Sequence, residues 1–351
     1  MQSSAEEPPR WNERRGRVLL FTTGPILAGR PSRRRRREGA SMRALRLLPR
    51  LTMLTLGLAC TPADDGTAPV GGPADPASAS SPVRNPIVEL LDEGQSVFGV
   101  FSGPKTAEQG ALMAEVADAD LVFYSLEDGP FDLDTMQAYM DALRVGAADP
   151  ASARPLVLRV PPVSAGEDTL VERVSAALDA GVHGVVFPHV RNSRDAEVAV
   201  AAMRFAGSTG EPSGTRPSSV GRAPRVWGVA EGEYRRGADV WPLASEGQLV
   251  AMLIVEDREG VEHASEIAAT PGVGVLFAGP GDLRRAFEGD MEQVERAIQT
   301  VLAACKRHSV PCGITAGPED VANRLGQGFR LIIVQQLEAL AVGRAAAGRD
   351  D

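Results

Sequence analysis

The sequence lacks several features that identify common classes of protein. No glycine-rich dinucleotide fingerprint and no phosphate-binding P-loop follows any of its apolar runs, so nothing favours a nucleotide-binding, doubly wound sheet. Aromatic side chains make up only 5% of the 351 residues, and there are three Cys and four His. The small number of His leaves few candidates for an imidazole base.

Positive charge is scarce outside the front of the chain. The formal net charge is −9, yet residues 1–41 carry ten Arg against four Glu and residues 42–59 add three more Arg. About −18 therefore remains for residues 60–351, which favours solubility and argues against a nucleic-acid partner. What the composition does supply, 43% hydrophobic residues with plentiful Gly and Pro, suits one large α/β domain with non-globular extensions.

The front end resembles an export signal. In residues 42–60, three Arg precede a short apolar stretch that ends in Gly57-Leu58-Ala59-Cys60, the order typical of a bacterial lipoprotein signal with lipidation at Cys60. A transmembrane anchor is the alternative, but the stretch falls short of the ~20 residues that a span needs. We therefore predict a cell-envelope lipoprotein, in contact with the membrane only through its lipid; the protein would be cytoplasmic if the signal is not used.

The segments around this signal follow from the same interpretation. If translation starts at Met42, residues 1–41 are a mispredicted extension; otherwise they are a disordered basic tail. Residues 61–84 are rich in Pro, Ala, Ser, Gly and Asp, a composition that predicts a disordered linker. Of the other cysteines, Cys305 falls in a helical pattern and Cys312 in a strand pattern, so we expect two buried thiols rather than a disulfide or a metal pair.

Residues 85–351 alternate apolar runs with helical patterns. The runs lie at 97–103, 119–127, 155–161, 182–190, 248–257, 273–279, 310–316 and 329–335. Eight strand and helix repeats in ~260 residues predict a single-domain (β/α)8 TIM barrel of the α/β class, with parallel strands. One connection, residues 208–247, is unusually long, and we expect it to contribute to substrate specificity.

Two apolar runs each end in a single acid, Glu256 and Asp282. Because the C-terminal ends of barrel strands converge, these carboxylates are candidates to share a hard divalent cation. Arg159 ends a third run. Each residue alone also fits a helix cap or a structural ion pair, but together they describe one cation and several carboxylates at the same end of a barrel.

The order of the motifs is that of a known family. VFGVFSG, DLVFYSLEDGPFD, PLVLRVP, GVHGVVFPHVRNSRDA, LIVEDREGVEHASEIAATPGV and VLFAGPGDL resemble the HpcH/HpaI aldolase/citrate lyase family, metal-dependent pyruvate aldolases of the phosphoenolpyruvate/pyruvate barrel superfamily. The resemblance implies Glu256 and Asp282 as ligands of Mg²⁺, Mn²⁺ or Co²⁺. It also implies that Arg159 binds the keto oxygen, that the backbone amides at Gly281 and Asp282 hold the carboxylate, and that the protein forms a homo-oligomer.

The resemblance fails at the acid-base motif. Family aldolases carry a His base and an Asp three residues earlier, whereas this sequence has Asp128 and Ser125 at those positions. Asp128 is the candidate base only if burial or the neighbouring acid, Glu127, raises its pKa from the usual ~3.9. His189 is the other candidate; we assign it first to a structural or substrate-contact role.

Two functions remain from the sequence. The first is a divalent-metal-dependent carbon-carbon lyase of the aldolase type, which cleaves a 2-oxo acid or related carboxylate through a pyruvate-type enolate with an altered base. The alternative is an exported, non-catalytic carboxylate-binding protein that retains the barrel and the metal site. In both, the ligand is a small carboxylate and the cofactor a divalent cation.

Overall fold

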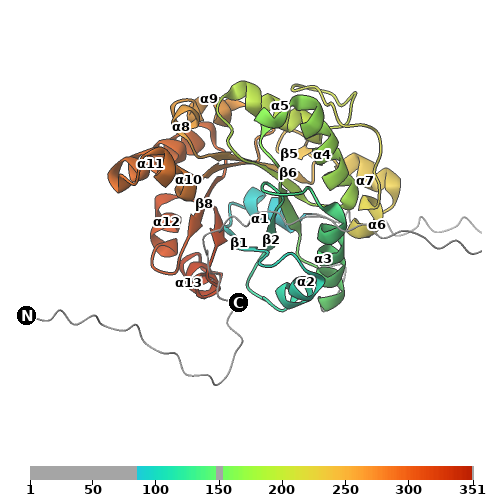
Figure 1. Cartoon of the computed structure of the whole chain (residues 1–351), viewed down its shortest axis with the longest axis horizontal. Coiled ribbons are helices and arrows are strands. Elements are labelled where there is room, and N and C mark those ends of the chain that lie inside the picture. Colours follow the sequence, from blue (N-terminus) through green and yellow to red (C-terminus); the bar gives the residue numbers. More distant parts are fainter. Residues whose placement is uncertain (1–84, 148–152, 350–351) are drawn as a thin grey trace, which may run out of the picture. The chain divides into compact units, whose positions relative to one another are not determined.

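The computed structural model describes residues 85–147 and 153–349. Eight parallel strands close into a barrel, in which β4 pairs with β6 and β9 returns to β1 (Figure 1). The predicted TIM barrel is therefore confirmed. The predictions for residues 1–41, 42–60 and 61–84, including lipidation at Cys60, lie outside the described residues.

The strands alternate with the helices along the chain. The strands are β1 (Val97–Phe101), β2 (Leu121–Ser125), β3 (Leu156–Arg159), β4 (Gly184–Phe187), β5 (Val240–Trp241), β6 (Leu249–Val255), β7 (Val275–Ala278), β8 (Cys312–Ala316) and β9 (Leu331–Val334). The α-helices are α1 (Pro86–Asp92), α2 (Ala107–Ala114), α3 (Leu133–Gly146), α4 (Glu167–Ala180), α5 (Ser193–Met203), α6 (Ala223–Trp227), α7 (Glu231–Gly237), α8 (Arg258–Glu262), α9 (Ala264–Ala269), α10 (Pro280–Ala286), α11 (Met291–His308), α12 (Val321–Gln327) and α13 (Glu338–Ala346). The two-residue β5 is an addition beside the start of β6.

The barrel interior is filled by one face of each strand, because side chains alternate across a strand. Leu121 and Phe123 of β2 point into this inner cluster, whereas Val122 and Tyr124 belong to the outer layer beneath the helices. The space inside is fully used: a Cβ at Gly99 of β1 would lie 2.5 Å from the Leu121 side chain. The interior is thus a packed core, and ligands are expected at its mouth.

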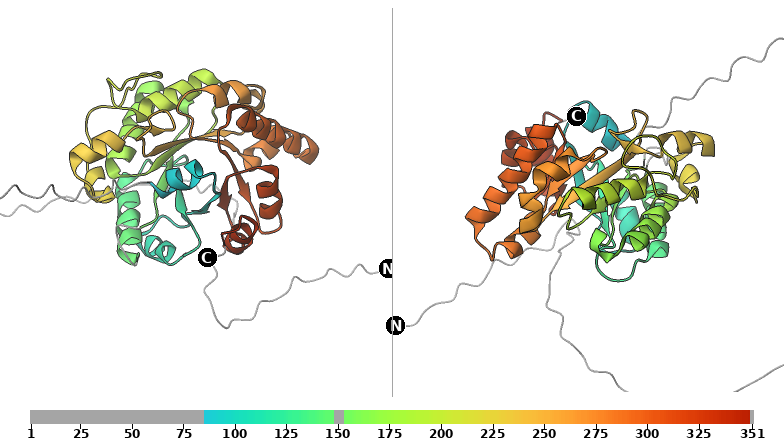
Figure 2. Two further views of the ribbon diagram at one scale, coloured as in Figure 1. Left: turned by 180° about the vertical axis from the view of Figure 1, so that it is seen from behind. Right: turned by 90° about the horizontal axis from the view of Figure 1, so that it is seen from above.

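Helix α1 covers one end of the barrel (Figure 2, left). The Asn85 side chain accepts a hydrogen bond from the Ile87 amide at 3.0 Å and so caps the helix. The same side chain donates to the carbonyls of His183 and Gln248, just before β4 and β6 begin. Ile87, with two other apolar residues of α1, packs on the inner cluster. This end, where the strands begin, is closed, so the opposite end is the mouth.

The long connection between α5 and β6 lies away from the mouth. Helices of the barrel run antiparallel to the strands, so a helix-to-strand connection returns at the end where the strands begin. Consistent with this, β5 pairs with the first residues of β6, and the Trp227 indole donates to the carbonyl of Gly181, just past α4. The expectation that residues 208–247 set specificity is therefore not supported by their position.

The expectation of two free buried thiols is wrong. Cys305 of α11 and Cys312 of β8 form a disulfide, with their Cα atoms 5.6 Å apart. The physical reason is the short connection between the end of α11 and β8, which places the two residues within the range that a disulfide requires. Spacing in the sequence alone did not reveal this, because the two residues lie in different elements.

Among the residues that the structure describes, no helix is both long enough and apolar enough to cross a membrane.

Candidate active site

The mouth of the barrel gathers side chains from four strand ends. Arg159 is the last residue of β3, Glu127 and His189 each follow a strand by two residues, and Glu256 directly follows β6. Arg159 lies beside Ser125 in the parallel register of β2 and β3. Polar residues take over in each case where the apolar strand ends, which is the pattern expected of a barrel active site.

Glu256 is the most deeply buried of these groups, with 3% of its surface exposed. Its Oε1 accepts a hydrogen bond from the backbone amide of His189 at 2.9 Å. Gly279, after β7, leaves the room for this carboxylate, since a Cβ there would lie 2.7 Å from both Cβ and Oε2 of Glu256. This glycine is thus required by the close approach of a functional side chain.

His189 has a left-handed backbone conformation, with φ of 53°. This conformation is uncommon for a residue other than glycine and is typical of functional turns. It presents the backbone amide to Glu256 while the imidazole lies between two acids. Nδ1 is 3.4 Å from Glu256 Oε1, and Nε2 is 3.5 Å from Glu127 Oε1.

Arg159 is held by two acceptors. One terminal nitrogen pairs with Glu127 Oε2 at 2.8 Å, and Nε donates to the Ser125 hydroxyl at 3.0 Å. The guanidinium also lies over the Phe123 ring, 5.6 Å from its centroid, which favours a cation in that position. Ser125 therefore helps Glu127 to orient the arginine.

Glu127, His189 and Glu256 form a cluster suited to a divalent cation. One ligand atom from each lies within 4.8 Å of the others. Ligands of an octahedral ion at ~2.1 Å are roughly 3 to 4.2 Å apart, so small side-chain rotations are enough to bring these three groups around one ion. Two carboxylates and one imidazole suit Mn²⁺ and Co²⁺ as well as Mg²⁺.

The environment disfavours the charged form of both acids. Burial raises the pKa of Glu256 to about 8, and the charges of Asp282 and Glu127 add to the increase, while the His189 amide and Arg159 oppose it. The pKa of Glu127 is also raised, chiefly by burial, with Arg159 opposing. A divalent cation, when bound, would supply the positive charge that these two adjacent carboxylates need.

The remaining residues predicted for the site lie around this cluster. Asp282, in the first turn of α10, pairs with Arg285; it is close enough for its charge to raise the pKa of Glu256. Gly281 faces open space. Asp128 is exposed on the turn after β2, and its charge also acts on Glu127.

The structure places Asp282 at the same mouth but outside the cluster of three. The assignments of Asp282 as a ligand, of Gly281 to the carboxylate and of Asp128 as the base therefore stay predictions.

Sequence reasoning missed the central place of Glu127. It was considered only as a neighbour able to raise the pKa of Asp128. In the structure Glu127 lies within reach of Arg159, His189 and Glu256, and Asp128 points to the exposed rim. Register would have given this result, because Glu127 is two residues past Ser125, and alternate residues share a face.

Comparison with known proteins agrees with this geometry. The model of the family "HpcH/HpaI aldolase/citrate lyase" matches residues 98–332. The chain belongs to this family. The match runs from within β1 to within β9 and includes Glu127, His189 and Glu256. The resemblance found in the motifs is therefore confirmed.

Individual relatives and a solved structure show the same relationship. The chain is 29% identical to the 5-keto-4-deoxy-D-glucarate aldolase of Citrobacter koseri over 213 residues, which are 60% of this chain and 73% of the relative. The aldolase of the same name from Enterobacter sp. is 30% identical over the same shares. A family structure from Burkholderia cenocepacia superposes with a TM-score of 0.61 at 28% identity, covering 75% of this chain and 97% of that one.

Proposed function

We propose that this protein is a divalent-metal-dependent carbon-carbon lyase, which cleaves a 2-oxo acid through a pyruvate-type enolate. The observation that carries the proposal is the cluster of Glu127, His189 and Glu256, which lies beside a fixed guanidinium at the barrel mouth. Membership of an aldolase/citrate lyase family supports it.

The cation would be held by Glu256 and Glu127 with His189, and the prediction from the motifs adds Asp282 as a further carboxylate ligand. When bound, a divalent ion supplies Lewis-acid polarisation of a carbonyl, and it requires its protein ligands to be deprotonated. The chain's own contribution is to keep these ligands at a mouth whose floor is apolar, so that charge interactions there are strong.

Arg159 supplies the second fixed positive charge. Its side chain is 21% exposed, so it is open to a substrate yet shielded from bulk water. Glu127 holds one terminal nitrogen of Arg159, and Ser125 holds its Nε. The other terminal nitrogen is therefore held in a fixed direction and can donate a hydrogen bond to a developing enolate oxygen. Such preorganised donors typically contribute about 10²–10³-fold to the rate.

The scissile hydroxyl also needs a proton acceptor, and here the protein departs from its family. Ser125 is engaged with Arg159, so it orients no base. Asp128 is exposed at the rim, so it lacks the burial that we expected of a base. The adjacent carboxylate of Glu127 is the feature that supports Asp128 as the proposed acceptor. Asp128→Asn should then reduce cleavage while leaving metal binding unchanged, whereas Ser125→Ala should weaken substrate binding by releasing the arginine.

The metal site is tested first, by thermal unfolding with and without Mn²⁺. Because Glu256 and Glu127 are expected ligands, Glu256→Gln and Glu127→Gln should each abolish the increase in melting temperature that Mn²⁺ causes. Glu259→Gln, an exposed carboxylate on α8 only three residues from Glu256, is the matched control and should respond like the wild type. An unchanged response in both site variants would refute the metal site.

The reaction is tested by proton exchange. With Mn²⁺ present, the enzyme should exchange the methyl protons of pyruvate for deuterium, and Arg159→Lys should slow this because a single ammonium cannot reproduce the guanidinium's contacts. The name of the relatives makes 5-keto-4-deoxy-D-glucarate the first candidate substrate for a cleavage assay.

A non-catalytic carboxylate-binding protein is the second candidate. The observation that favours it is the loss of the family's His and Asp at positions 128 and 125. In that case pyruvate would bind in the presence of Mn²⁺ and no methyl exchange would occur. Measurable exchange of the methyl protons in the wild type, and its loss in Glu256→Gln, would exclude a non-catalytic protein.

We also propose that the protein acts in the cell envelope as a lipoprotein. The Cys305–Cys312 disulfide supports this location, because disulfides persist in oxidising compartments and are rare in the cytosol. Wild-type protein should fractionate with membranes, and Cys60→Ser should release it. Membrane fractionation of the Cys60→Ser variant would contradict lipidation at this residue.

A further inference from the structure

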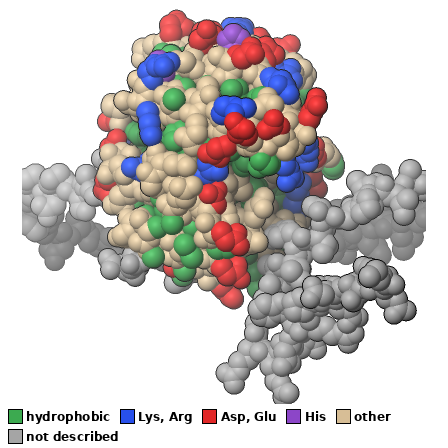
Figure 3. Space-filling view, turned by 90° about the vertical axis from the view of Figure 1, so that its left-hand side faces the viewer, with side chains coloured by type: hydrophobic (Ala, Val, Ile, Leu, Met, Phe, Trp, Pro, Cys, Tyr) green, Lys and Arg blue, Asp and Glu red, His purple; other side chains and the backbone are tan. Residues whose placement is uncertain are grey.

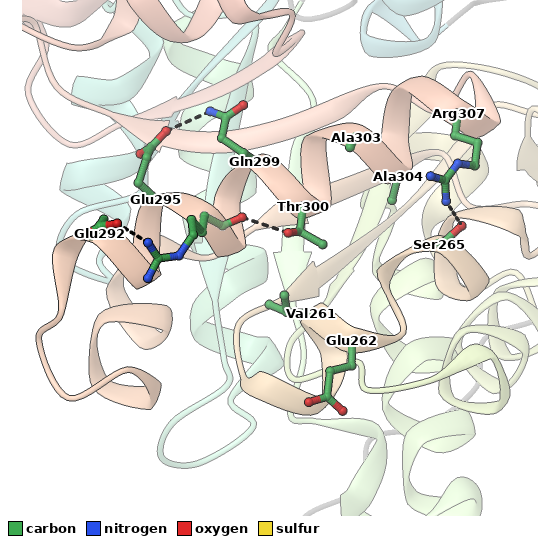
Figure 4. A pocket seen from close by; sticks show the side chains of 11 residues that line it. Val261, Glu262, Ser265, Glu292, Glu295, Gln299, Thr300, Ala303, Ala304 and Arg307 are labelled. Carbon is green, nitrogen blue, oxygen red and sulfur yellow. Dashed lines mark hydrogen bonds and ion pairs between the residues drawn. The ribbon is translucent and has the colours of Figure 1, made fainter.

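A groove of about 740 Å³ runs along the outside of the barrel, between α11 and the α8–α9 pair (Figure 4). Sites for small molecules typically enclose ~300–1,000 Å³. Small side chains, among them Ala303, Ala304 and Val261, line the middle of the groove, and polar or charged ones line its two ends. Because α11 ends just before β8 begins, the end of the groove at Arg307 lies away from the barrel mouth.

The hydroxyl of Ser265, in the first turn of α9, lies between two basic side chains at this end of the groove. Its Oγ is 2.9 Å from Nε2 of His308 and accepts a hydrogen bond from Nη1 of Arg307 at 3.0 Å. A hydroxyl has one hydrogen to donate, and a guanidinium can only donate. The hydroxyl hydrogen of Ser265 is therefore free to point to Nε2 of a neutral His308, which accepts it.

This arrangement is typical of an activated nucleophile. A serine hydroxyl is a weak nucleophile until an adjacent base takes its proton, and His308 lies at the distance that a general base requires. Ser265 and His308 are both half-buried, so the pair is partly shielded from water and open to the groove. No acid pairs with His308 among the residues that the structure describes, so the site is a dyad and should work more slowly than a triad.

The end of α11 holds the two basic side chains in place. Arg307 and His308 are the last two residues of this helix. The disulfide from Cys305, in the same last turn, to Cys312 ties the helix end to β8. The base therefore approaches Ser265 from a fixed position, which matters because small displacements of reacting groups have large effects on rates.

We propose that Ser265 is the nucleophile of a second, metal-independent active site, which hydrolyses esters of short-chain carboxylic acids. Oγ bonds to the ester carbonyl carbon while His308 takes the hydroxyl proton, and the carbonyl oxygen becomes an oxyanion beside the guanidinium of Arg307. The bond from carbon to the alcohol oxygen then breaks, and the alcohol leaves with the proton from His308. Water, which gives a proton to His308, attacks the acyl-serine; the carboxylic acid leaves, and Oγ regains the proton.

The groove favours a short, uncharged acyl group. Ala304 and Thr300 lie along the groove from Ser265 (Figure 4), and they span about 6 Å of the helix at 1.5 Å per residue. A longer chain would reach the polar end, at Gln299 and Arg296. Acidic and basic side chains are interspersed on the described residues in Figure 3, which favours a neutral ester over a strongly charged substrate.

The nucleophile is tested by reaction of the full chain with a fluorophosphonate, from which Oγ displaces fluoride while His308 takes the proton. Peptide mass spectrometry should find the phosphonate on Ser265. His308→Asn should slow this labelling by about a hundredfold or more, since a positioned base typically contributes 10²–10⁴-fold. Ser175 on α4 is the internal control and should stay unlabelled, because its hydroxyl has no hydrogen-bond partner within the described part of the chain.

The reaction is measured as hydrolysis of 4-nitrophenyl butyrate with EDTA present, so that the cation cluster at the mouth makes no contribution. Ser265→Ala should reduce hydrolysis to the rate measured without protein. His263→Asn is the matched control for the base, because His263 lies two residues before Ser265 but pairs with Glu266; it should keep the wild-type rate.

Labelling of Ser265 that depends on His308, together with hydrolysis that Ser265→Ala abolishes, would support the proposal. Three results would overturn it: no phosphonate on Ser265 in the folded wild type, labelling of His308→Asn at the wild-type rate, or hydrolysis that Ser265→Ala leaves unchanged.

Discussion

Acid should destabilise this protein through one largely buried histidine, His183, of which a small part is reached by solvent. The residue directly precedes β4, the strand that leads to His189, and its ring stacks on Trp227 of the long connection, with the two ring centroids 4.9 Å apart. Its Nδ1 is buried and has no hydrogen-bond partner within the described part of the chain. Burial, together with the charge of Arg144, lowers the pKa of His183 to about 4.

The sign and size of the effect follow from that pKa. The ordinary pKa of histidine is 6.5, so between pH 6.5 and pH 4 His183 is protonated in the unfolded chain and neutral in the folded chain. Stability is therefore complete above pH 6.5 and is lost as the pH falls towards 4. A difference of roughly 2.5 pKa units corresponds to at most about 3 kcal/mol, an upper bound because part of the residue is reached by solvent.

The assay is urea unfolding of the wild type and His183→Phe at several pH values between 7 and 4. Phenylalanine preserves the stacking on Trp227 and removes the titration. The free-energy difference between the two proteins should shift by up to about 3 kcal/mol in favour of the variant as the pH falls. His263→Asn, at an exposed site, is the control. Parallel pH profiles for the wild type and His183→Phe would refute the reasoning.

Three further outcomes are expected. Because the pKa of Glu256 is raised to about 8, a cation that binds at pH 7 displaces a proton from this carboxyl group. The affinity for Mn²⁺ should therefore increase with pH and level off above pH 8. Calorimetry in two buffers of different ionisation enthalpy will measure the released proton. Gly279→Ala should abolish Mn²⁺ binding without unfolding the barrel, since the new Cβ meets Glu256; normal binding would contradict the close approach. Cys305→Ser should cost about 2.5 kcal/mol in urea unfolding by the loop-entropy relation for the short loop to Cys312, and an unchanged midpoint would contradict a disulfide.

The barrel was predictable because its evidence is local. Each strand is an apolar run of the right length, and eight repeats leave few other arrangements. The placement of Arg159 and Glu256 followed for the same reason, since both stand where a run ends. Topology also determines that β9 meets β1, which needed no side-chain detail.

The features that could not be predicted depend on local backbone conformation and on how separate elements meet. The contact of His189 with Glu256 requires the left-handed backbone conformation at His189, and no pattern in the sequence predicts that conformation. The Cys305–Cys312 bond depends on how the end of α11 meets β8. The long connection, residues 208–247, was expected to contribute to substrate specificity, although the direction of α5 already required its return at the end of the barrel opposite the mouth.

Glu127 links the cation cluster to the arginine, and this has a consequence for the order of binding. Its Oε2 neutralises Arg159 while its Oε1 faces His189. A cation at the cluster attracts the same carboxylate and so weakens its hold on the guanidinium, which then has more positive charge to offer a keto oxygen. We therefore expect pyruvate to bind tightly only after the metal. In Glu127→Gln the guanidinium has lost its acid and the cation has lost a ligand, so without Mn²⁺ this variant should bind pyruvate more tightly than the metal-free wild type does. Metal-free binding no tighter than that of the wild type would show that Glu127 does not couple the two.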